Sequence, residues 1–313
     1  MPGANTNENP PAPASRGALI VAFAIVYLVW GSTYLGIRVA IETMPPVLMA
    51  GMRFVVSGVL IFTFLLIRGA KWPTLKEWKE QAVIGFFLLL GGNALVSWAE
   101  QHTPSGITAL ILGASPLMMV LVDWVRPGGR RPTLLLAVGV VIGIAGVALL
   151  LGPDAIPAGN RPPVIDIIAI IVSSLCWWIG SLYSKHVRSG TTPLMASAMQ
   201  MLCGSACMLL VGFMLGEGST VHFAAFSSRS WVAFAYLVVV GSIVTFPVYI
   251  WLLDHSTPAK VSTYAYVNPV VAVFLGWALL GEPMNLRIIL AATVIIGAVA
   301  ILTVGRSRAS SAT

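Results

Sequence analysis

The side chains in this chain that could bind a solute are aromatic and neutral polar groups, and they stand within long apolar segments. Trp30, Ser32 and Tyr34 lie together in one of these segments, and Trp177 and Trp178 lie in another. Indole, phenol and hydroxyl groups recognise small molecules by stacking and hydrogen bonding, without any net charge. These residues therefore predict a binding wall for an apolar or zwitterionic solute. Their alternative role is an aromatic belt at a membrane surface.

Later segments carry further candidates for the same wall. Asn93 and Trp98 share one segment, and Tyr249 stands in another. Tyr264 and Asn268 are four residues apart, so in a helix they lie on one face. An amide within lipid needs a hydrogen-bond partner, which for Asn93 is either a neighbouring helix or the solute.

Arg53 is the one cation well inside an apolar segment, and a charge in such a place favours a functional role. Its guanidinium could bind a substrate carboxylate, pair with Glu42 or Glu100, or hold backbone carbonyl groups. The eleven acids of the chain, Glu100 and Glu282 among them, all lie outside the middle of an apolar segment. Any coupling to protons would therefore use groups at segment ends, such as Glu100 or Asp254.

The apolar segments lack the residues that a catalytic site or a metal site within the membrane would need. Catalysis within a membrane needs converging acids or a metal cluster at depth, but the polar residues found there are Ser, Thr, Tyr and Asn. We therefore assign no catalytic residue and expect no enzyme. Cys176, Cys203 and Cys207 form neither a disulfide framework nor a metal motif, and no Walker-type phosphate loop is present, so no metal or cofactor is expected. The basic residues stand in short connectors, which is unlike a nucleic-acid footprint.

The elements that must position these residues are membrane-spanning helices. The 313-residue chain is 58% apolar and only 9% charged, whereas a soluble domain is about 25% charged. A helix needs about 20 apolar residues to cross the hydrocarbon core. We therefore predict an all-α integral membrane protein with ten transmembrane helices, at 18–37, 46–68, 82–98, 107–125, 133–152, 164–184, 193–215, 231–253, 261–280 and 286–305.

The Lys and Arg residues indicate how these helices are oriented. Thirteen of the 18 fall in the two tails and the even-numbered connectors, and three or four fall on the opposite side. Because basic residues concentrate in cytoplasmic loops, this bias predicts that both termini lie in the cytoplasm.

The chain repeats itself after a constant offset of 147 residues. Trp30, Arg38, Pro46 and Arg53 of the first half match Trp177, Lys185, Pro193 and Gln200 of the second half. Because each copy holds an odd number of helices, the second copy must enter the membrane from the opposite side. Such inverted repeats are typical of transporters. We predict five-helix repeats at 17–152 and 164–305, with a disordered cytoplasmic tail at 1–16 and a second cytoplasmic tail at 306–313.

Prolines interrupt matched helices of the two halves. Pro116 stands in the fourth predicted span and Pro269 in the ninth, while Pro247 lies in the eighth. A proline within a helix removes a backbone hydrogen bond and bends the helix. Within lipid the freed carbonyl must be satisfied by protein or by a water-filled cavity. We therefore assign these prolines to helix bending or gating near the binding region, the alternative being a simple packing kink.

The order of these residues resembles the drug/metabolite transporter superfamily, and in particular its EamA-type ten-helix members. The likeness covers residues 17–305 and depends on Trp30-Gly31-Ser32-Thr33-Tyr34, Pro46, Arg53, Pro116, Asn268-Pro269 and Gly281-Glu282-Pro283. One feature departs from the pattern. The Gly-Glu pair that the family often has after its fourth helix is missing, because residues 123–129 read Asp-Trp-Val-Arg-Pro-Gly-Gly.

The resemblance implies export of small metabolites, often amino acids, across the bacterial inner membrane. It implies a cavity walled by helices one, three, four, six, eight and nine, and it points to the aromatic amino-acid exporters of the YddG type. We expect alternating access, with a small-molecule substrate and the lipid bilayer as partners. Efflux of drugs or other metabolites, and a non-transporting receptor or scaffold, are the alternatives. Gly139 and Gly143 allow close helix contact, so we expect a monomer or a weak homodimer.

Overall fold

The structure is a computed structural model that describes residues 15–117, 133–152, 161–187, 190–256, 258–261 and 263–311. Several sequence predictions fall outside these residues. They are the tail through residue 14, the end of the fourth predicted span, the departing segment 123–129 and the side chain of Asp254.

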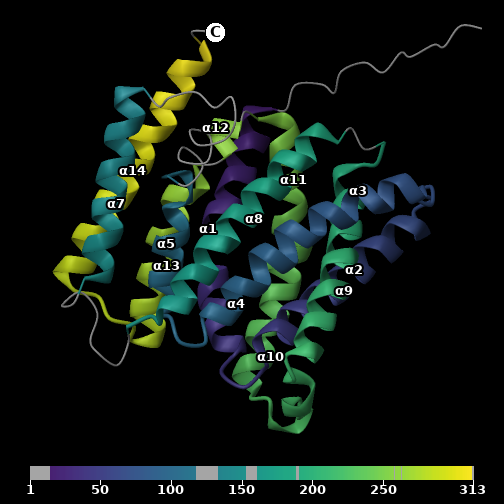
Figure 1. Cartoon of the computed structure of the whole chain (residues 1–313). Helices are drawn as coiled ribbons and strands as arrows, with labels where there is room; N and C mark the ends of the chain where they lie inside the picture. The colour runs from purple at the N-terminus through teal and green to yellow at the C-terminus, as the bar shows by residue number, and fades with distance from the viewer. Residues whose placement is uncertain are drawn as a thin grey trace, which may run out of the picture.

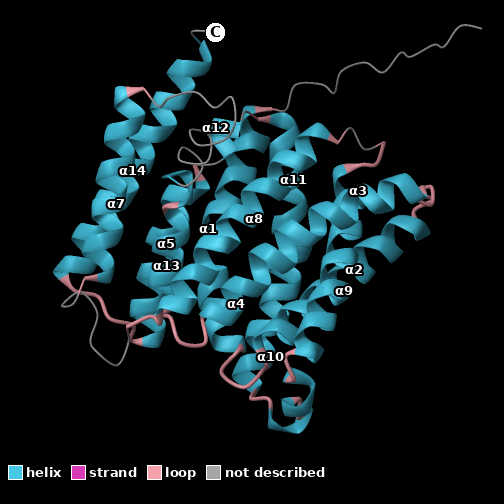
Figure 2. Ribbon diagram, in the orientation of Figure 1, coloured by secondary structure: helices cyan, strands magenta, loops and turns pink. Residues whose placement is uncertain are grey.

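The part of the chain that the structure describes forms helices and no strand (Figure 2). The elements are α1 (Arg16–Ala40), α2 (Pro46–Ile67), α3 (Leu75–Gly85), η1 (Phe86–Ala94), α4 (Leu95–Ala99), α5 (Ser105–Gly113), α7 (Leu134–Leu151), α8 (Val164–His186), α9 (Pro193–Met214), η3 (Glu217–Thr220), η4 (Phe223–Ala225), α10 (Ser228–Tyr236), η5 (Leu237–Val244), α11 (Thr245–His255), α12 (Pro258–Val261), α13 (Tyr264–Leu280) and α14 (Leu286–Ser311).

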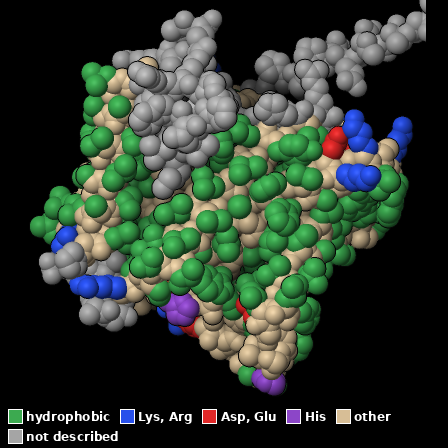
Figure 3. Space-filling model, viewed as in Figure 1, with side chains coloured by type: hydrophobic (Ala, Val, Ile, Leu, Met, Phe, Trp, Pro, Cys, Tyr) green, Lys and Arg blue, Asp and Glu red, His purple; other side chains and the backbone are tan. Residues whose placement is uncertain are grey.

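The lengths and hydropathy of these helices are those of a membrane protein. Seven are long and apolar enough to cross a bilayer: Arg16–Ala40, Pro46–Ile67, Leu75–Ala99, Leu134–Leu151, Val164–Ser184, Pro193–Met214 and Ser228–Leu253. Three shorter apolar helices, Ser105–Leu117, Tyr264–Leu280 and Leu286–Leu302, fall at the fourth, ninth and tenth predicted spans. On the face shown in Figure 3, hydrophobic side chains cover the middle of the bundle and charged side chains lie toward its two ends. The chain is therefore an all-helical, multi-pass membrane protein.

Two helices extend at one end by six or seven residues beyond the apolar runs that predicted them. The third membrane helix begins at Leu75 rather than at residue 82, because Thr74 and Glu77 form a capping box. The backbone N–H of Thr74 donates to Glu77 Oε2 (2.6 Å), and that of Glu77 donates to Thr74 Oγ1 (3.3 Å). Helix α14 continues to Ser311, into the residues predicted as a tail. Hydropathy marks the lipid-facing part of a helix, whereas capping groups set where its backbone begins.

Glycines let helices from the two halves of the chain cross closely. Helix α2 packs against α9, and a Cβ added at Gly51 would lie only 2.8 Å from Leu209 Cδ2. In lipid, helices gain little from excluding water, so close van der Waals contact between backbones is a main source of association.

Helices α7 and α14 form a pair beside the rest of the bundle (Figure 1). Gly139 faces Leu302 of α14, and Gly143 faces Leu117, with added Cβ atoms 2.8 and 2.5 Å from the nearest leucine carbons. The two glycines singled out in the sequence thus provide packing within one chain.

We call the end of the bundle at which α1 begins the amino end, and the end at which α1 stops at Ala40 the distal end (top and bottom of Figure 1). Between these ends, α1 contacts α13, α11 and α5, while α8 packs on η1, α4 and α5. These elements surround the centre of the molecule.

Candidate solute-binding site

Four aromatic side chains from four helices meet inside the bundle. Trp30 of α1 lies with its ring centroid 5.5 Å from that of Trp177 in α8, 4.7 Å from that of Tyr249 in α11 and 5.5 Å from that of Tyr264 in α13. These separations are in the range that favours aromatic pairs. At 1.5 Å per residue, Trp30 lies about 21 Å along α1 from its start, just past the middle. We call these four residues the aromatic cluster.

Polar contacts tie the cluster together toward the amino end. The hydroxyl of Tyr249 lies 3.2 Å from Ser181 Oγ of α8. The hydroxyl of Tyr27 in α1 hydrogen-bonds Thr263 Oγ1 beside α13. The cluster and these bonds link α1, α8, α11 and α13 near the middle of the bundle.

A cavity of about 120 Å³ lies on the distal side of the aromatic cluster. Its walls are Trp30, Thr33, Tyr34, Ile37, Arg53, Phe54, Gly92, Asn93, Val96, Ala109, Leu112, Gly113, Ser115, Ser173, Ser174, Trp177, Gly241, Phe246, Tyr264, Ala265, Asn268 and Pro269. These residues come from the first, third, fourth, sixth, eighth and ninth spans, which the family resemblance implies, and from the second span in addition.

Arg53 is the addition from the second span, and its side chain is only 4% exposed. Its Nε donates to Ser242 Oγ (2.7 Å), and its guanidinium carbon lies 4.7 Å from the centroid of the Phe54 ring. Among the described residues no carboxylate forms an ion pair with Arg53. Glu42 instead pairs with Arg229, at 3.6 Å. A cation that is buried in a cavity wall in this way can bind an anionic group of a solute.

Asn268 holds α1 and α13 together at the cavity. Its side chain is 3% exposed, and its Nδ2 donates to the carbonyls of Tyr27 (3.0 Å) and Tyr264 (3.2 Å). Pro269, the next residue, lacks the N–H that would bond the carbonyl of Ala265. That carbonyl faces Gly113 of α5, where an added Cβ would be 3.2 Å from it. The proline thus coincides with a close crossing of α5 and α13.

Two π-helical segments flank the cavity at corresponding places in the third and eighth spans. They are η1 (Phe86–Ala94) and η5 (Leu237–Val244). The hydroxyls of Ser242 in η5 and of Thr245, the first residue of α11, donate to the carbonyls five residues earlier, at Leu237 (3.0 Å) and Val240 (2.7 Å). Such widened turns are rare and recur at functional sites. Here they bring Gly92 against Trp177 and Gly241 against Arg53.

A second layer of side chains closes the cavity toward the distal end. We call Tyr34, Arg38, Glu100 and Glu282 the distal layer. Glu100 follows the last residue of α4 and is fully buried, and neither of its carboxylate oxygens accepts a hydrogen bond from a described residue. Burial, and then the neighbouring Glu282, raise the pKa of Glu100 well above its usual range, while the charge of Arg38 lowers it.

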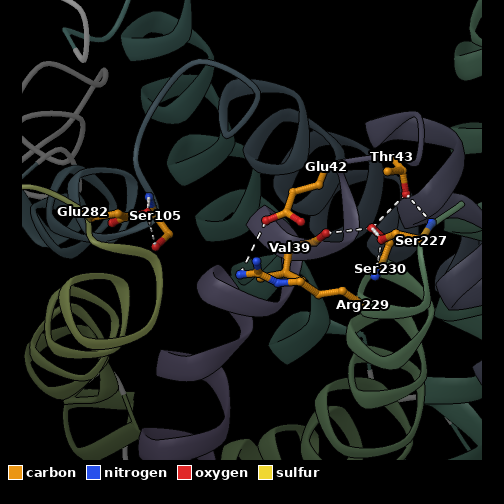
Figure 4. Close-up of polar contacts among 8 residues, drawn as sticks. All are labelled: Val39, Glu42, Thr43, Ser105, Ser227, Arg229, Ser230 and Glu282. Atoms are coloured by element: carbon orange, nitrogen blue, oxygen red, sulfur yellow. Dashed lines mark hydrogen bonds and ion pairs between the residues drawn. The ribbon is translucent and has the colours of Figure 1, made fainter.

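The other charged groups of the distal layer bind backbone. Arg38 donates to the carbonyls of Glu100 and of Gln101 (2.8 Å). Glu282 caps α5, because its carboxylate accepts from Ser105 N (2.7 Å), Ser105 Oγ (2.8 Å) and Gly106 N (2.9 Å) (Figure 4). A carboxylate at a helix N-terminus is favoured by the helix dipole. The negative charge of Glu282 therefore stabilises the N-terminus of α5.

The structure brings half of the sequence-predicted site residues to the wall of one cavity. Eight of them line its wall: Trp30, Tyr34, Arg53, Asn93, Trp177, Tyr264, Asn268 and Pro269. Asn93 is half-buried and makes no hydrogen bond to a described residue. Tyr249 belongs to the aromatic cluster behind this wall.

Five other predicted residues lie away from the cavity wall. Ser32 donates to Val29 O (2.7 Å) and meets the hydroxyl of Tyr236 (2.5 Å). Trp98 packs on His102, with centroids 6.5 Å apart. Trp178 is half-buried one position beyond Trp177, which on a helix turns it to another face. Pro116 follows a break in α5 at Ala114, and Pro247 sits in the first turn of α11.

Sequence reasoning missed the residues that support Arg53. Gly241 and Ser242 lie in a widened turn, and hydropathy carries no signal for a π-helix. Phe54 stands next to Arg53, which was recognised, and helical spacing alone does not decide whether its ring reaches the cavity. Among the described residues, no group of three or more His, Cys, Asp or Glu side chains is placed to hold a metal ion.

Comparison with known proteins decides the family. A model of the EamA-like transporter family matches residues 17–152 and again residues 164–304. The chain belongs to the EamA-like transporter family. The transporter is 38% identical over 291 residues to the "Uncharacterized inner membrane transporter YedA" of Escherichia coli K12, covering 92% of this chain and 91% of that one.

More distant relatives span the transporter equally well. It is 24% identical over 301 residues to the "Uncharacterized transporter YvbV" of Bacillus subtilis 168, covering 96% of this chain and 95% of that one. A crystal structure of a protein with 20% sequence identity shares the fold, with a TM-score of 0.65 over 93% of this chain and 99% of that chain. These likenesses make the chain a multi-pass transporter of the inner membrane, and not an enzyme.

Proposed function

We propose that this transporter exports small metabolites, and specifically zwitterionic amino acids with aromatic or other apolar side chains. One observation carries the proposal. The buried guanidinium of Arg53 lines a cavity that the aromatic cluster bounds, and no described carboxylate neutralises it.

The cavity matches the three parts of such a solute. Arg53 offers charged donors to the carboxylate. The rings of Trp30, Trp177 and Tyr264 offer stacking surfaces to the side chain, and their faces attract an ammonium group. The half-buried amide of Asn93 adds an acceptor for that ammonium.

The charge of the cavity argues against more acidic solutes. Arg53 is the sole Lys or Arg among the described residues of its wall. A nucleotide sugar carries several negative charges and would need several cations along its path. A single cation suits a single carboxylate.

We infer alternating access by two inverted five-helix repeats, 17–152 and 164–305, with both termini in the cytoplasm. The twofold family match, the paired π-helical segments and the 147-residue offset support the repeat. The aromatic cluster and the distal layer lie on opposite sides of the cavity, as gates of such a cycle would. An odd number of helices per repeat would invert the second copy, and we expect these gates to lie toward opposite membrane faces.

The test compares two solutes that differ by one carboxylate. Purified transporter in liposomes should exchange labelled tryptophan, phenylalanine and methionine. The Arg53→Gln variant carries at position 53 the side chain of its repeat counterpart Gln200. It should bind tryptophan about 10- to 100-fold more weakly, because a hydrogen bond to a charged group contributes about 1.5–3 kcal/mol. Binding of tryptamine, which lacks the carboxylate, should not change.

Two outcomes would contradict the proposal. One is an equal loss for tryptophan and tryptamine in the Arg53→Gln variant, which would make Arg53 a structural residue. The other is wild-type exchange of lipophilic drugs or tryptamine without any amino-acid exchange, which would favour drug efflux instead.

A further inference from the structure

Glu100 is a buried carboxyl group that the proposed binding site does not use. Its side chain is 0% exposed, and neither of its oxygens accepts a hydrogen bond from the described part of the chain. An ionised carboxylate without partners is costly to bury, and such a group usually takes up a proton instead.

The position of Glu100 places it between two water-accessible spaces. The central cavity ends at Ile37 and Val96. A distal pocket of about 900 Å³ begins one residue farther along α1, at Arg38, and is also lined by Gln101. The carboxyl group of Glu100 interacts with Tyr34 of the cavity wall and with Arg38 and Glu282 of the distal pocket, so it lies between the two spaces.

The charged and titratable groups around Glu100 do not neutralise it. From α1, Tyr34 and Arg38 are close enough to interact with it electrostatically, but Arg38 donates its described hydrogen bonds to backbone carbonyls. From the connector after α13, Glu282 adds a second negative charge that is already engaged in capping α5.

The next titratable pair along the layer has partners at one carboxylate oxygen, Asp166 Oδ2, while Asp166 Oδ1 accepts no hydrogen bond from a described residue. Asp166 of α8 accepts from Thr103 Oγ1 (2.9 Å), and its Oδ2 lies 3.5 Å from His102 Nδ1. This pair therefore provides an internal comparison, since its carboxylate has partners where that of Glu100 has none.

We propose that Glu100 is a proton-binding site of the transport cycle: its carboxyl group carries a proton while the distal layer is closed and releases it to water when the layer opens. The inference rests on the proposed transport function and makes one of its steps, the opening of the distal layer, depend on pH. On opening, the O–H bond of the carboxyl breaks and the proton passes to water in the distal pocket. On closing, the carboxylate takes a proton back from that water, so no further reactant is needed.

The sign of the pH dependence follows from the two states. Burial raises the pKa of Glu100 in the closed layer, whereas in the open layer the group approaches its ordinary value near 4.3. Between these two pKa values the closed layer binds one proton more than the open layer does. Lower pH therefore favours closure and higher pH favours opening, by about tenfold in the equilibrium per pH unit.

The experiment measures opening by thiol labelling in nanodiscs without any solute. Val96→Cys is introduced with Cys176, Cys203 and Cys207 replaced by Ala, and a membrane-impermeant thiol reagent is applied between pH 5 and 9. Because the thiolate fraction itself rises with pH, each rate is divided by the rate of the same cysteine in a Glu100→Gln background. The ratio should rise with pH by up to about tenfold per unit. Glu42→Gln, at the same end, should leave this rise intact.

A second measurement needs no variant that could misfold. Infrared difference spectra of the wild-type transporter, recorded between pH 5 and 9, should show the band of a protonated carboxyl group. This band should disappear over the same pH range in which the labelling rate rises. A ratio that is constant with pH, or the absence of such a band, would overturn the proton site. Because no amino acid is present, failure of amino-acid exchange would leave this result standing, and a constant ratio would leave the proposed substrate standing.

Discussion

Arg53 shows how a membrane protein keeps a buried cation that has no acidic partner in the part of the chain that the structure describes. Ser242 fixes the Nε of its guanidinium, and the neighbouring Phe54 ring faces its charge. Gly241 leaves room for the guanidinium, since an added Cβ would lie 3.0 Å from its Nη2. The terminal nitrogens are thereby left at the cavity wall, where a solute carboxylate can complete their hydrogen bonding.

The close approach of Gly241 to the Arg53 guanidinium leads to a testable prediction. In Gly241→Ala the new methyl group should displace the guanidinium of Arg53 and press on Thr33, whose Cγ2 would be 3.1 Å away. Overpacking of this kind costs about 1–3 kcal/mol. Tryptophan binding, measured by titration calorimetry, should weaken about tenfold, with little loss for tryptamine. Gly297→Ala is the matched control, because no described heavy atom lies within 4 Å of its added Cβ.

At the scale of elements, glycines and widened turns decide how near the helices come. Gly204 of α9 crosses the junction of α3 and η1 so closely that an added Cβ would lie 2.7 Å from the Gly85 carbonyl oxygen and 2.8 Å from Leu89 Cβ. The buried pair Gln81 and Gln200 hydrogen-bonds at the same crossing, at 2.7 Å. Close backbone contact and an interhelical amide bond thus act together there.

Gly204→Ala should therefore destabilise the bundle as a whole. The added methyl group meets backbone and a Cβ atom, neither of which can rotate away, so we expect a loss of about 1–3 kcal/mol. The midpoint of thermal unfolding in detergent should fall, while Gly297→Ala should leave it unchanged. An unchanged midpoint in Gly204→Ala would show that α9 can shift without cost.

At the scale of the whole molecule, the candidate binding site exists because distant segments meet. The aromatic cluster takes one residue from the first half of the chain and three from the second: Trp30, and Trp177, Tyr249 and Tyr264. Arg53 and Ser242, which hold each other, are 189 residues apart. Movement of one half against the other would therefore change the cavity on several sides at once.

Removing the rings of the aromatic cluster tests this arrangement. Trp30→Ala, Trp177→Ala and Tyr264→Ala should each slow tryptophan exchange in liposomes at least tenfold, since each removes a stacking surface at the cavity. Trp277→Ala is the matched control, because Trp277 is 49% exposed and packs on Phe274 away from the site. Full exchange in all three cluster variants would remove the aromatic wall from the proposal.

The amino-acid sequence by itself determined that this is a helical membrane transporter. Apolar runs of about 20 residues cannot remain in water, and within lipid their backbones must bond internally, so each run becomes a helix. The order of Trp30, Arg53, Asn268 and Pro269 along those runs is enough to indicate the family and much of the cavity wall. The position of Arg53 inside an apolar run also marks it as unusual from the sequence alone.

Only the tertiary structure decided what these residues touch. It gave Arg53 a hydroxyl partner instead of Glu42 or Glu100 and engaged Glu282 as the cap of α5. It also left the carboxylate of Glu100 buried without a hydrogen bond from a described residue. It also placed Trp177 at the cavity and Trp178 away from it. The physical reason is that these partners come from segments more than 150 residues apart. Which side chains meet then depends on how the helices rotate and cross, and hydropathy carries no information about either.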